Sequence, residues 1–442
     1  MSSQETAVTG KTLAIHGGNP VRTEPLPLEF PGVHHMGAEE EAAVLRVIRS
    51  RSLFRFYGVD LGNETASLES EFAAFLGVRH AVAVASGTGA LHTALGALGV
   101  GPGQEVIVPA YLWISIVAAV VNRGAIPVFA DIDDTFCLDP AAVEKQITPR
   151  TAGIVMVHMS GAPGNAPAIQ KVARAHNLFL LEDCAQCNGG SIAGRKVGTF
   201  GDMAIFSFQM NKNMTSGEGG MVTTDDQRLY RRAVACHDLG FPRNDEGRLM
   251  LDIPDLSLWG MGYRMDELRA AVLREQLRKV PKITGAMRGS KYRIRAALEK
   301  LASVRLRTIL DPAGDTGCFL ITTFRDGRTA LKVRDALLAE GIRTGAQGVS
   351  NIVMTGWGLH LYYNNPSLVN RASVDGKGFP WNLPANSESA TEYGKGLCPV
   401  ADSLFERSIL IPIPSCLTTR DEDDIIAAFE KVLPALESGA LD

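Results

Sequence analysis

Lys212 has the surroundings of a lysine that could act as a nucleophile. It follows the apolar segment 202–208 and lies in a stretch of Asn, Thr, Ser and Gly, residues 209–220, that has no hydrophobic period. The first segment predicts a β-strand and the second a polar loop. Burial beside a strand lowers the pKa of an amine, and a neutral amine can attack a carbonyl carbon. For a lysine considered alone, a solvated surface position is the commoner alternative.

A turn rich in Gly, Ser and Thr is a second candidate site. It spans residues 86–90, follows the apolar segment 81–85 and precedes a helical pattern. Free N–H groups and the positive end of a helix dipole make such a start an anion site. A dinucleotide-binding turn would have a third glycine where this chain has His92, and no Walker pattern is present. The turn therefore indicates a single phosphate, although many such turns bind nothing.

An acidic residue and an aromatic residue complete the candidate chemistry. Asp183 ends the apolar segment 178–183 and precedes Lys212 by about 30 residues, enough for one crossover between strand ends. A carboxylate at that position would keep a facing pyridine nitrogen protonated, or it could simply cap a helix. Trp113 follows the apolar segment 105–109 and could stack on a flat ligand or belong to the core.

The elements that must position these residues alternate in type along the first half of the chain. Strands are expected at 81–85, 105–109, 126–131, 153–158, 178–183 and 202–208, and helices at 37–50, 64–76, 140–146 and 167–176, with another opening at 111–114. This alternation predicts an α/β fold with a mostly parallel sheet. Ligands of such sheets gather at the carboxyl ends of the strands.

The second half of the chain predicts a smaller C-terminal α/β domain. Residues 265–278 indicate an amphipathic helix that Pro281 interrupts, followed by a second helix at 282–301. Strands are expected at 319–324 and 409–413, and a closing helix at 421–433. Residues 345–397 are rich in Trp and Tyr but irregular, and we interpret them as a lid or wall of the substrate pocket, or as a dimer-packing arm. The predicted organisation is an arm at 1–36, a large domain at 37–280 and a small domain at 281–442.

Composition and charge argue against several classes of protein. A net charge of −4 over 442 residues gives no basic surface for nucleic acid. The longest mainly apolar run, residues 111–121, is too short to span a membrane, and the N-terminus lacks the pattern of a secretory signal. Seven scattered cysteines favour reduced thiols in the cytoplasm. Cys184 and Cys187 lack the second pair that zinc would need, so we expect buried thiols and no metal.

Several separate motifs resemble the DegT/DnrJ/EryC1/StrS aminotransferases, which are pyridoxal-phosphate (PLP) enzymes of fold type I that act on keto-sugars and keto-cyclitols. The resemblance covers roughly residues 12–435, with the order and spacing of the motifs preserved. The matching segments are 86–91, 182–186, 201–208, 212–220, 263–271 and 398–414.

The resemblance implies roles for individual residues. Lys212 would bind PLP as a Schiff base and shuttle a proton, and Asp183 would pair with the pyridine nitrogen. The other implied cofactor contacts are Thr88, Gly89 and Ser207 at the phosphate, Trp113 on the ring and Gln186 at the ring hydroxyl. One position departs from the family: Gly262 stands where an Asn commonly reaches the phosphate of the partner subunit. Tyr263, Arg264 or a water molecule would have to make that contact here.

The function implied by the resemblance is transamination. Glutamate or glutamine would give its amino group to a keto-sugar, keto-cyclitol or related ketone in specialised, antibiotic-type metabolism. The enzyme would be a cytoplasmic homodimer with its active sites at the subunit interface. Lys212 argues against the related sugar dehydratases, which have His at this position. Aromatising relatives keep the lysine and stay open as an alternative, as does a non-catalytic PLP-binding regulator.

Overall fold

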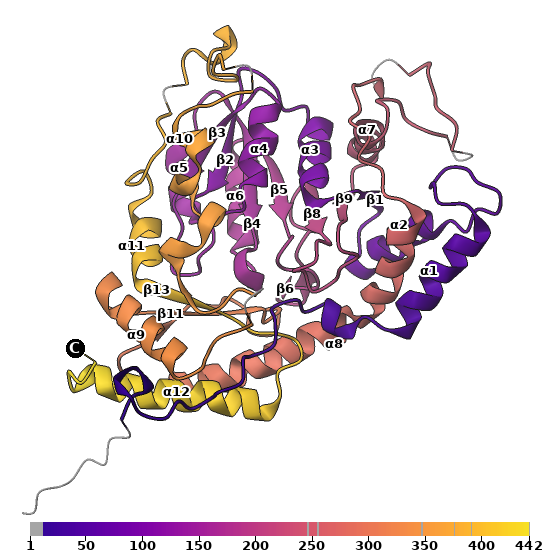
Figure 1. Cartoon of the computed structure of the whole chain (residues 1–442). Coiled ribbons are helices and arrows are strands. Elements are labelled where there is room, and N and C mark those ends of the chain that lie inside the picture. The colour runs from indigo at the N-terminus through magenta and orange to yellow at the C-terminus, as the bar shows by residue number, and fades with distance from the viewer. Residues whose placement is uncertain are drawn as a thin grey trace, which may run out of the picture.

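Two sheets organise the chain in the computed structural model (Figure 1). The structure describes residues 12–244, 247–253, 256–345, 348–374, 376–389 and 391–441. The start of the predicted arm, residues 1–11, and positions 346, 347, 375 and 390 of the predicted aromatic segment lie outside the described residues.

The larger sheet has seven strands in the order β1-β9-β8-β5-β4-β2-β3. They are β1 (His80–Val84), β2 (Glu105–Pro109), β3 (Ile126–Ala130), β4 (Thr151–Val157), β5 (Phe179–Asp183), β8 (Met203–Ser207) and β9 (Gly220–Thr224). The pairings from β8 to β3 are parallel, which confirms the predicted α/β class. Strand β1 at the edge of the sheet pairs antiparallel with β9, and it therefore runs in the same direction as β8 and the other parallel strands. Strand β9 itself runs antiparallel to β8.

Helices cover both faces of this sheet. They are α1 (Ala38–Ser50), α2 (Glu64–Leu76), α3 (Gly87–Leu98), α4 (Ser115–Asn122), α5 (Pro140–Gln146), α6 (Ala166–Ala175) and α7 (Gln227–His237). Strands β2, β3 and β8 are buried along their whole length, as expected for strands covered on both sides. The predicted helix start at 111–114 was wrong, since α4 begins at Ser115 and Tyr111 forms an isolated bridge with Leu361.

Helix α8 (Glu267–Leu298) is continuous over 32 residues, so the predicted break at Pro281 was also wrong. A proline removes one helix hydrogen bond, here the one to the Leu277 carbonyl oxygen, and in the turn that follows the Thr284 hydroxyl donates to the Val280 carbonyl oxygen at 2.9 Å. The helix also packs against α1, α2 and α12 (Thr419–Glu437), which holds it together through the proline. It runs beneath the seven-stranded sheet (Figure 1).

The smaller sheet has four antiparallel strands in the order β10-β11-β13-β12. They are β10 (Arg305–Leu306), β11 (Phe319–Thr323), β12 (Ile352–Val353) and β13 (Ser408–Pro412). With α9 (Gly327–Ala339), α11 (Pro399–Arg407) and α12, they form the smaller C-terminal α/β unit that the sequence predicts. The domain boundary at 280/281 falls inside α8 and stays a prediction.

The described part of the aromatic segment 345–397 is irregular and lies along strand β3. It contains only β12, short 3-10 turns and α10 (Pro366–Val369). The Tyr393 hydroxyl donates to the Pro127 carbonyl oxygen at 2.9 Å, and the Asn386 amide donates to that of Gly124 at 2.9 Å. The segment therefore covers the open edge of the large sheet, which would otherwise be free to pair with another chain.

The remaining short elements are β6 (Ser191–Ile192), β7 (Arg195–Lys196) and 3-10 turns at Ala14–His16, Val33–His35, Met159–Gly161, Met354–Gly356, Gly358–His360, Tyr362–Asn364 and Pro384–Asn386. None of the described helices combines the length and the apolar character that crossing a bilayer requires.

Candidate active site

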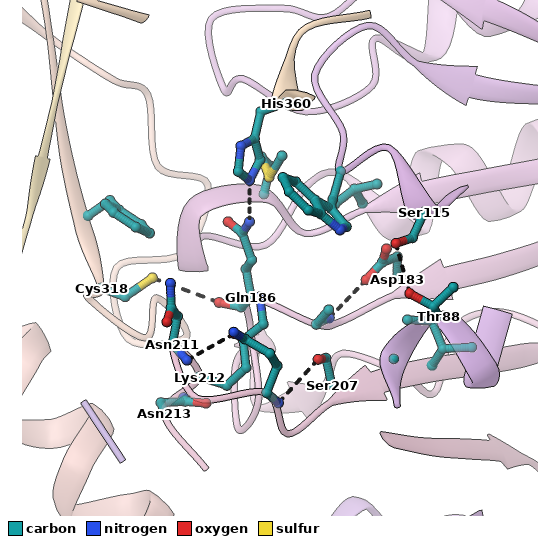
Figure 2. A pocket seen from close by; sticks show the side chains of 18 of the residues that line it. Thr88, Ser115, Asp183, Gln186, Ser207, Asn211, Lys212, Asn213, Cys318 and His360 are labelled. Carbon is teal, nitrogen blue, oxygen red and sulfur yellow. Dashed lines mark hydrogen bonds between the residues drawn. The ribbon is translucent and has the colours of Figure 1, made fainter. Parts of the chain in front are cut away.

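A cavity of about 400 Å³ lies at the carboxyl ends of β5 and β8. Side chains from the N-terminal arm, the large sheet, the Lys212 loop and the aromatic segment line it. Six of the seven predicted site residues are among them: Thr88, Trp113, Asp183, Gln186, Ser207 and Lys212. Figure 2 shows five of these six with labels, projecting from separate elements into one space.

The start of helix α3 forms the anion-binding end of the cavity. The Ser86 hydroxyl caps the helix by accepting the Gly89 N–H at 3.0 Å, and the Ser86 carbonyl oxygen accepts the Ala90 N–H at 2.9 Å. The first two amides of the helix, at Gly87 and Thr88, have no carbonyl within the helix. The seventh predicted residue, Gly89, is not among the lining residues, and its N–H is used by this cap.

Two hydroxyl groups stand beside these amides. Thr88 Oγ1 lies 2.8 Å from Ser115 Oγ at the start of α4, a contact that the sequence did not indicate (Figure 2). Ser207, at the end of β8, lies so close to the helix start that a Cβ at Gly87 would be 2.7 Å from its Cβ. Glycine at 87 therefore permits the approach that brings the Ser207 hydroxyl to the helix start.

Asp183 is a buried carboxylate at the end of β5, with 4% of its surface exposed. It accepts the Ala185 N–H at 2.9 Å. Burial raises its pKa to about 6, although the Ala185 N–H and the neighbouring Lys212 and His158 side chains act in the opposite direction. The group is therefore ionised at neutral pH but costly to keep without a cationic partner.

Lys212 lies on the polar loop that follows β8, as the sequence predicts. Burial lowers the pKa of its amine, and the charge of Asp183 offsets part of that effect. The backbone of the loop is fixed from two sides. Lys212 N–H donates to the Gln209 carbonyl oxygen at 2.9 Å, and its own carbonyl oxygen accepts the Gly32 N–H at 3.1 Å. The amine is thus held at the cavity with a larger neutral fraction than a surface lysine has.

Gln186 is oriented by contacts at both ends of its amide. Its Oε1 accepts the Ser160 N–H at 2.9 Å, which leaves the NH₂ group to donate into the cavity. One acceptor is His360 Nε2 at 3.4 Å (Figure 2). His360 Nδ1 lies 3.1 Å from the Trp357 carbonyl oxygen, so the ring proton is on Nδ1 and Nε2 is free to accept. Burial lowers the pKa of His360 to about 3, so the ring is neutral.

An aromatic wall closes the cavity from the side of the smaller sheet. The Trp357 and His360 rings are stacked, with centroids 4.3 Å apart and planes 6° apart. His360 also lies 4.8 Å from the ring of Trp113, which stays 44% exposed. These contacts support the interpretation of the aromatic segment as a pocket wall. His360 was missed because one histidine in an irregular stretch carries no periodic or motif signal.

His158, Glu182 and Cys184 form a buried group whose ligand atoms lie close enough to hold a metal ion. The Glu182 oxygens, however, accept the N–H groups of Gly198, Phe200 and Gly201 and lie 3.0 Å from His158 Nε2. His158 Nδ1 accepts the Gly164 N–H, which places the ring proton on Nε2 toward Glu182. This saturated network braces the end of β5 beside Asp183, and its donor pattern is not that of a metal site.

The fold and the site together define a PLP-dependent enzyme of fold type I, with a lysine and a carboxylate at neighbouring strand ends and an anion-binding helix start. Residues 35–363 match the model of the DegT/DnrJ/EryC1/StrS aminotransferase family. The chain belongs to this family.

Named relatives act on different ketones. The L-glutamine:2-deoxy-scyllo-inosose aminotransferase of Streptoalloteichus tenebrarius is 43% identical over 275 residues, which cover 61% of this chain and 63% of that protein. The UDP-N-acetyl-3-dehydro-alpha-D-glucosamine 3-aminotransferase of Acidithiobacillus ferrooxidans is 39% identical over 356 residues, 80% of this chain and 84% of that protein. The solved structure of DesV from S. venezuelae superposes with a TM-score of 0.74 at 29% identity and covers 92% of this chain and 98% of DesV.

The chain matches less than two thirds of the length of the first of these relatives.

The family is PLP-dependent, and the residues of the cavity fit this cofactor. Of the described residues that line it, only Lys212 carries an aliphatic amine able to bond to the aldehyde. The α3 start with Thr88 and Ser207 suits the phosphate, and the ionised Asp183 suits a protonated ring nitrogen.

The departure at Gly262 has a structural consequence. Its φ is +70°, and no atom lies within 4 Å of the position that a Cβ would take, so space for a side chain is open there. Arg264, one replacement considered for the missing Asn, is held by Asp238 at 2.6 Å within this chain. Tyr263 packs instead against Gly89, whose Cβ would be 3.2 Å from the ring. The contact with the partner subunit's phosphate stays a prediction.

Proposed function

We propose that this protein is a PLP-dependent aminotransferase that moves the amino group of glutamine or glutamate to a keto-cyclitol, a keto-sugar or a related ketone. The observation that carries the proposal is the meeting of Lys212 and Asp183 in one cavity beside the α3 start. The named relatives support the substrate classes. We further propose a cytoplasmic homodimer whose active sites lie at the subunit interface.

The cofactor, when bound, accepts the amino group and stabilises negative charge at the α-carbon of the donor. Asp183 holds the proton on the ring nitrogen by opposing its charge. Thr88, Ser207 and the first amides of α3 would hold the phosphate, Gln186 would donate to the ring hydroxyl, and Trp113 would lie against the ring.

Lys212 has two tasks that its lowered pKa serves. Its Nζ is the atom that binds the cofactor covalently, and once released it is the base that takes the proton from Cα of the amino donor. A base works best when its pKa lies near the operating pH, and burial moves that of Lys212 downward. The Trp357 and His360 wall excludes water from the same space.

Lys212→Ala is the direct test. The variant should lose the absorbance of covalently bound PLP and the half-reaction with glutamine, both followed by spectrophotometry. Lys171→Ala, on the exposed face of α6, is the matched control and should keep both. A Lys212→Ala protein that converts donor at the rate of the parent enzyme would refute the proposed function.

Asp183→Asn tests the second role. The amide cannot oppose the charge of a protonated ring, so proton removal from the donor should slow by about 100-fold or more. The variant should still take up some PLP, because the phosphate contacts remain. Stopped-flow measurement of the donor half-reaction gives the rate, and an unchanged rate would remove Asp183 from the mechanism.

An aromatising or dehydrating enzyme is the second candidate function. The solved structure of 3-amino-5-hydroxybenzoic acid synthase is 26% identical to this chain with a TM-score of 0.72. The same architecture therefore also occurs in an enzyme that is named for a different product. Mass spectrometry of the product separates the two, because amination exchanges oxygen for nitrogen and dehydration removes water. Bound PLP without turnover of any donor would favour the non-catalytic regulator.

A further inference from the structure

Glu29 is a buried carboxylate at the cavity, and one of its oxygens has no hydrogen-bond partner among the described residues. It lies on the N-terminal arm and lines the same cavity as Lys212. Only 7% of its surface is exposed, and its Oε2 has no hydrogen-bond partner within the described chain. An isolated buried carboxylate is costly, and such groups in native proteins are normally paired. This exception calls for a partner beyond the described residues, and a ligand of the cavity that Glu29 lines can supply it.

The position of Glu29 is fixed by the backbone on either side. Before it, the Leu26 N–H donates to the Arg343 carbonyl oxygen at 2.8 Å. After it, the Ser415 hydroxyl donates to the Pro31 carbonyl oxygen at 2.8 Å, and the Gly32 N–H donates to that of Lys212 at 3.1 Å. The arm is therefore attached both to the smaller sheet and to the Lys212 loop, and Glu29 is held between these attachments.

The charges around the cavity limit what can approach Glu29. Of the described lining residues, Lys212 is the only lysine or arginine, and the acidic ones are Glu29, Asp183 and Glu218. Under the proposed function, Lys212 and Asp183 are occupied with the cofactor. The part of the cavity that remains for the acceptor then has two carboxylates and no cation from this chain.

We propose that Glu29 is a specificity-determining residue that accepts hydrogen bonds from the acceptor substrate. The acceptor is then a free keto-polyol whose hydroxyl or ammonium groups donate to the carboxylate, and it carries no phosphate. A nucleotide-linked keto-sugar would bring diphosphate charge toward two carboxylates, which is unfavourable. This inference rests on the proposed function and narrows its substrate class.

The test compares acceptor half-reactions of the enzyme after it has been converted to its amino form with glutamine. The probes are 2-deoxy-scyllo-inosose, a free keto-cyclitol, and UDP-N-acetyl-3-dehydro-α-D-glucosamine, a nucleotide-linked keto-sugar. The parent enzyme should prefer the keto-cyclitol by tenfold or more in kcat/KM. Glu29→Gln should lower kcat/KM for the keto-cyclitol by about tenfold or more, mainly through KM, because a hydrogen bond to a charged group is lost.

Controls separate substrate recognition from a structural role. Glu24→Gln removes an exposed carboxylate on the same arm and should change nothing. Glu29→Gln should leave the glutamine half-reaction within about twofold of the parent and should raise the Tm of the substrate-free holoenzyme, because an unpaired charge is removed. A lower Tm together with slower reactions of both substrates would mean that Glu29 is structural, for example paired with the partner subunit, and would overturn the proposal.

Two further outcomes would also overturn it. These are an unchanged kcat/KM for the keto-cyclitol in Glu29→Gln, and a preference of the parent enzyme for the nucleotide-linked sugar. If the parent enzyme reacts with neither glutamine nor glutamate, the proposed function fails instead. Calorimetric titration of the holoenzyme with the keto-cyclitol then decides the inference alone, since Glu29→Gln should weaken binding by about tenfold and equal binding would refute it.

Discussion

Asp183 illustrates a functional group that is unfavourable for the protein by itself. Burial raises its pKa to about 6, which means that the free carboxylate is held at a cost in the absence of a cationic ring. The rest of the fold keeps the carboxylate in this unfavourable position at the end of β5, where the His158–Glu182 hydrogen bond holds the strand in place. Under the proposed function, a protonated pyridine ring would remove this cost on binding and so contribute to cofactor affinity.

The pH dependence of stability tests this account. Because the pKa of Asp183 is higher in the folded chain than its usual value of 3.8, the unfolded chain releases the proton first. The free energy of unfolding of cofactor-free protein should therefore fall as pH rises from about 4 to 6, by up to roughly 3 kcal/mol. Asp183→Asn should lack this component and be the more stable protein at pH 7 without PLP.

Chemical denaturation of the cofactor-free proteins at pH 4.5 and pH 7 measures the difference, at about 0.1 M salt so that surface charges are screened. Asp335→Asn, on the exposed side of α9, should follow the parent at both values of pH. Identical pH profiles for Asp183→Asn and the parent would show that the carboxylate is solvated in the free protein.

Single residues were predictable from the sequence where the chemistry is local. The sequence places three such features at or just after the ends of predicted strands: Asp183, Lys212 and the turn at 86–90. In each case the residue types of the segment indicate the chemistry. Glu29 and His360 reach the same cavity from segments without a periodic pattern, far from Lys212 along the chain. Their positions depend on how the arm and the aromatic segment fold back onto the sheets, which the sequence does not encode in any short stretch.

Elements were predictable where hydrophobic runs are bounded by turn residues, and less so where tertiary contacts override a local signal. The strands and helices that were predicted for the large sheet lie within a few residues of the expected ranges, whereas β9 and α7 were not predicted. The reversed strand β9 between β1 and β8 was missed because pairing partners are not visible in a single apolar run. The start of α4 was misplaced because Tyr111 and Leu112 are apolar for burial in the core rather than for helix formation.

Helix α8 gives the clearest test at the scale of elements. Pro281 leaves the Leu277 carbonyl oxygen without its helix donor, and its side chain is exposed. Pro281→Ala restores the N–H and should raise the free energy of unfolding by about 1 to 3 kcal/mol, less a fraction for the greater entropy of the unfolded chain. Thermal unfolding measures the change, with Lys282→Ala on the same exposed side as a neutral control.

A lower Tm for Pro281→Ala would mean that α8 needs a bend at this position to reach both sheets. The buried neighbours Val280 and Ile283 would then be displaced when the helix straightens. The prediction therefore distinguishes a proline that the packing merely tolerates from one that the packing requires.

At the scale of the whole molecule, Arg307 joins the smaller sheet to the larger one. It follows β10, is 2% exposed, and its guanidinium donates to backbone oxygens after β3 and after β4. These acceptors are the carbonyl oxygens of Thr135 at 2.6 Å, Met159 at 2.8 Å and Ala162 at 3.5 Å. The second of these loops contains Ser160, whose N–H orients Gln186 in the cavity. The Arg307 side chain thus holds the smaller sheet against the larger one and, through the same loop, helps to keep Gln186 in place in the cavity.

Arg307→Lys should lower both the stability of the protein and its affinity for PLP. A single ammonium group cannot reach oxygens on two loops, so at least one buried carbonyl loses its donor and the free energy of unfolding should fall by about 2 to 4 kcal/mol. The PLP affinity should fall as well, because the loop that orients Gln186 loosens. Arg305→Lys, two residues earlier and exposed, keeps the charge and should match the parent in both measurements. Chemical denaturation and PLP titration followed by absorbance provide the two values.

Loss of stability with full PLP affinity would show that the site is positioned by the large sheet alone. Equal stability of the two variants would show that water replaces the guanidinium between the sheets.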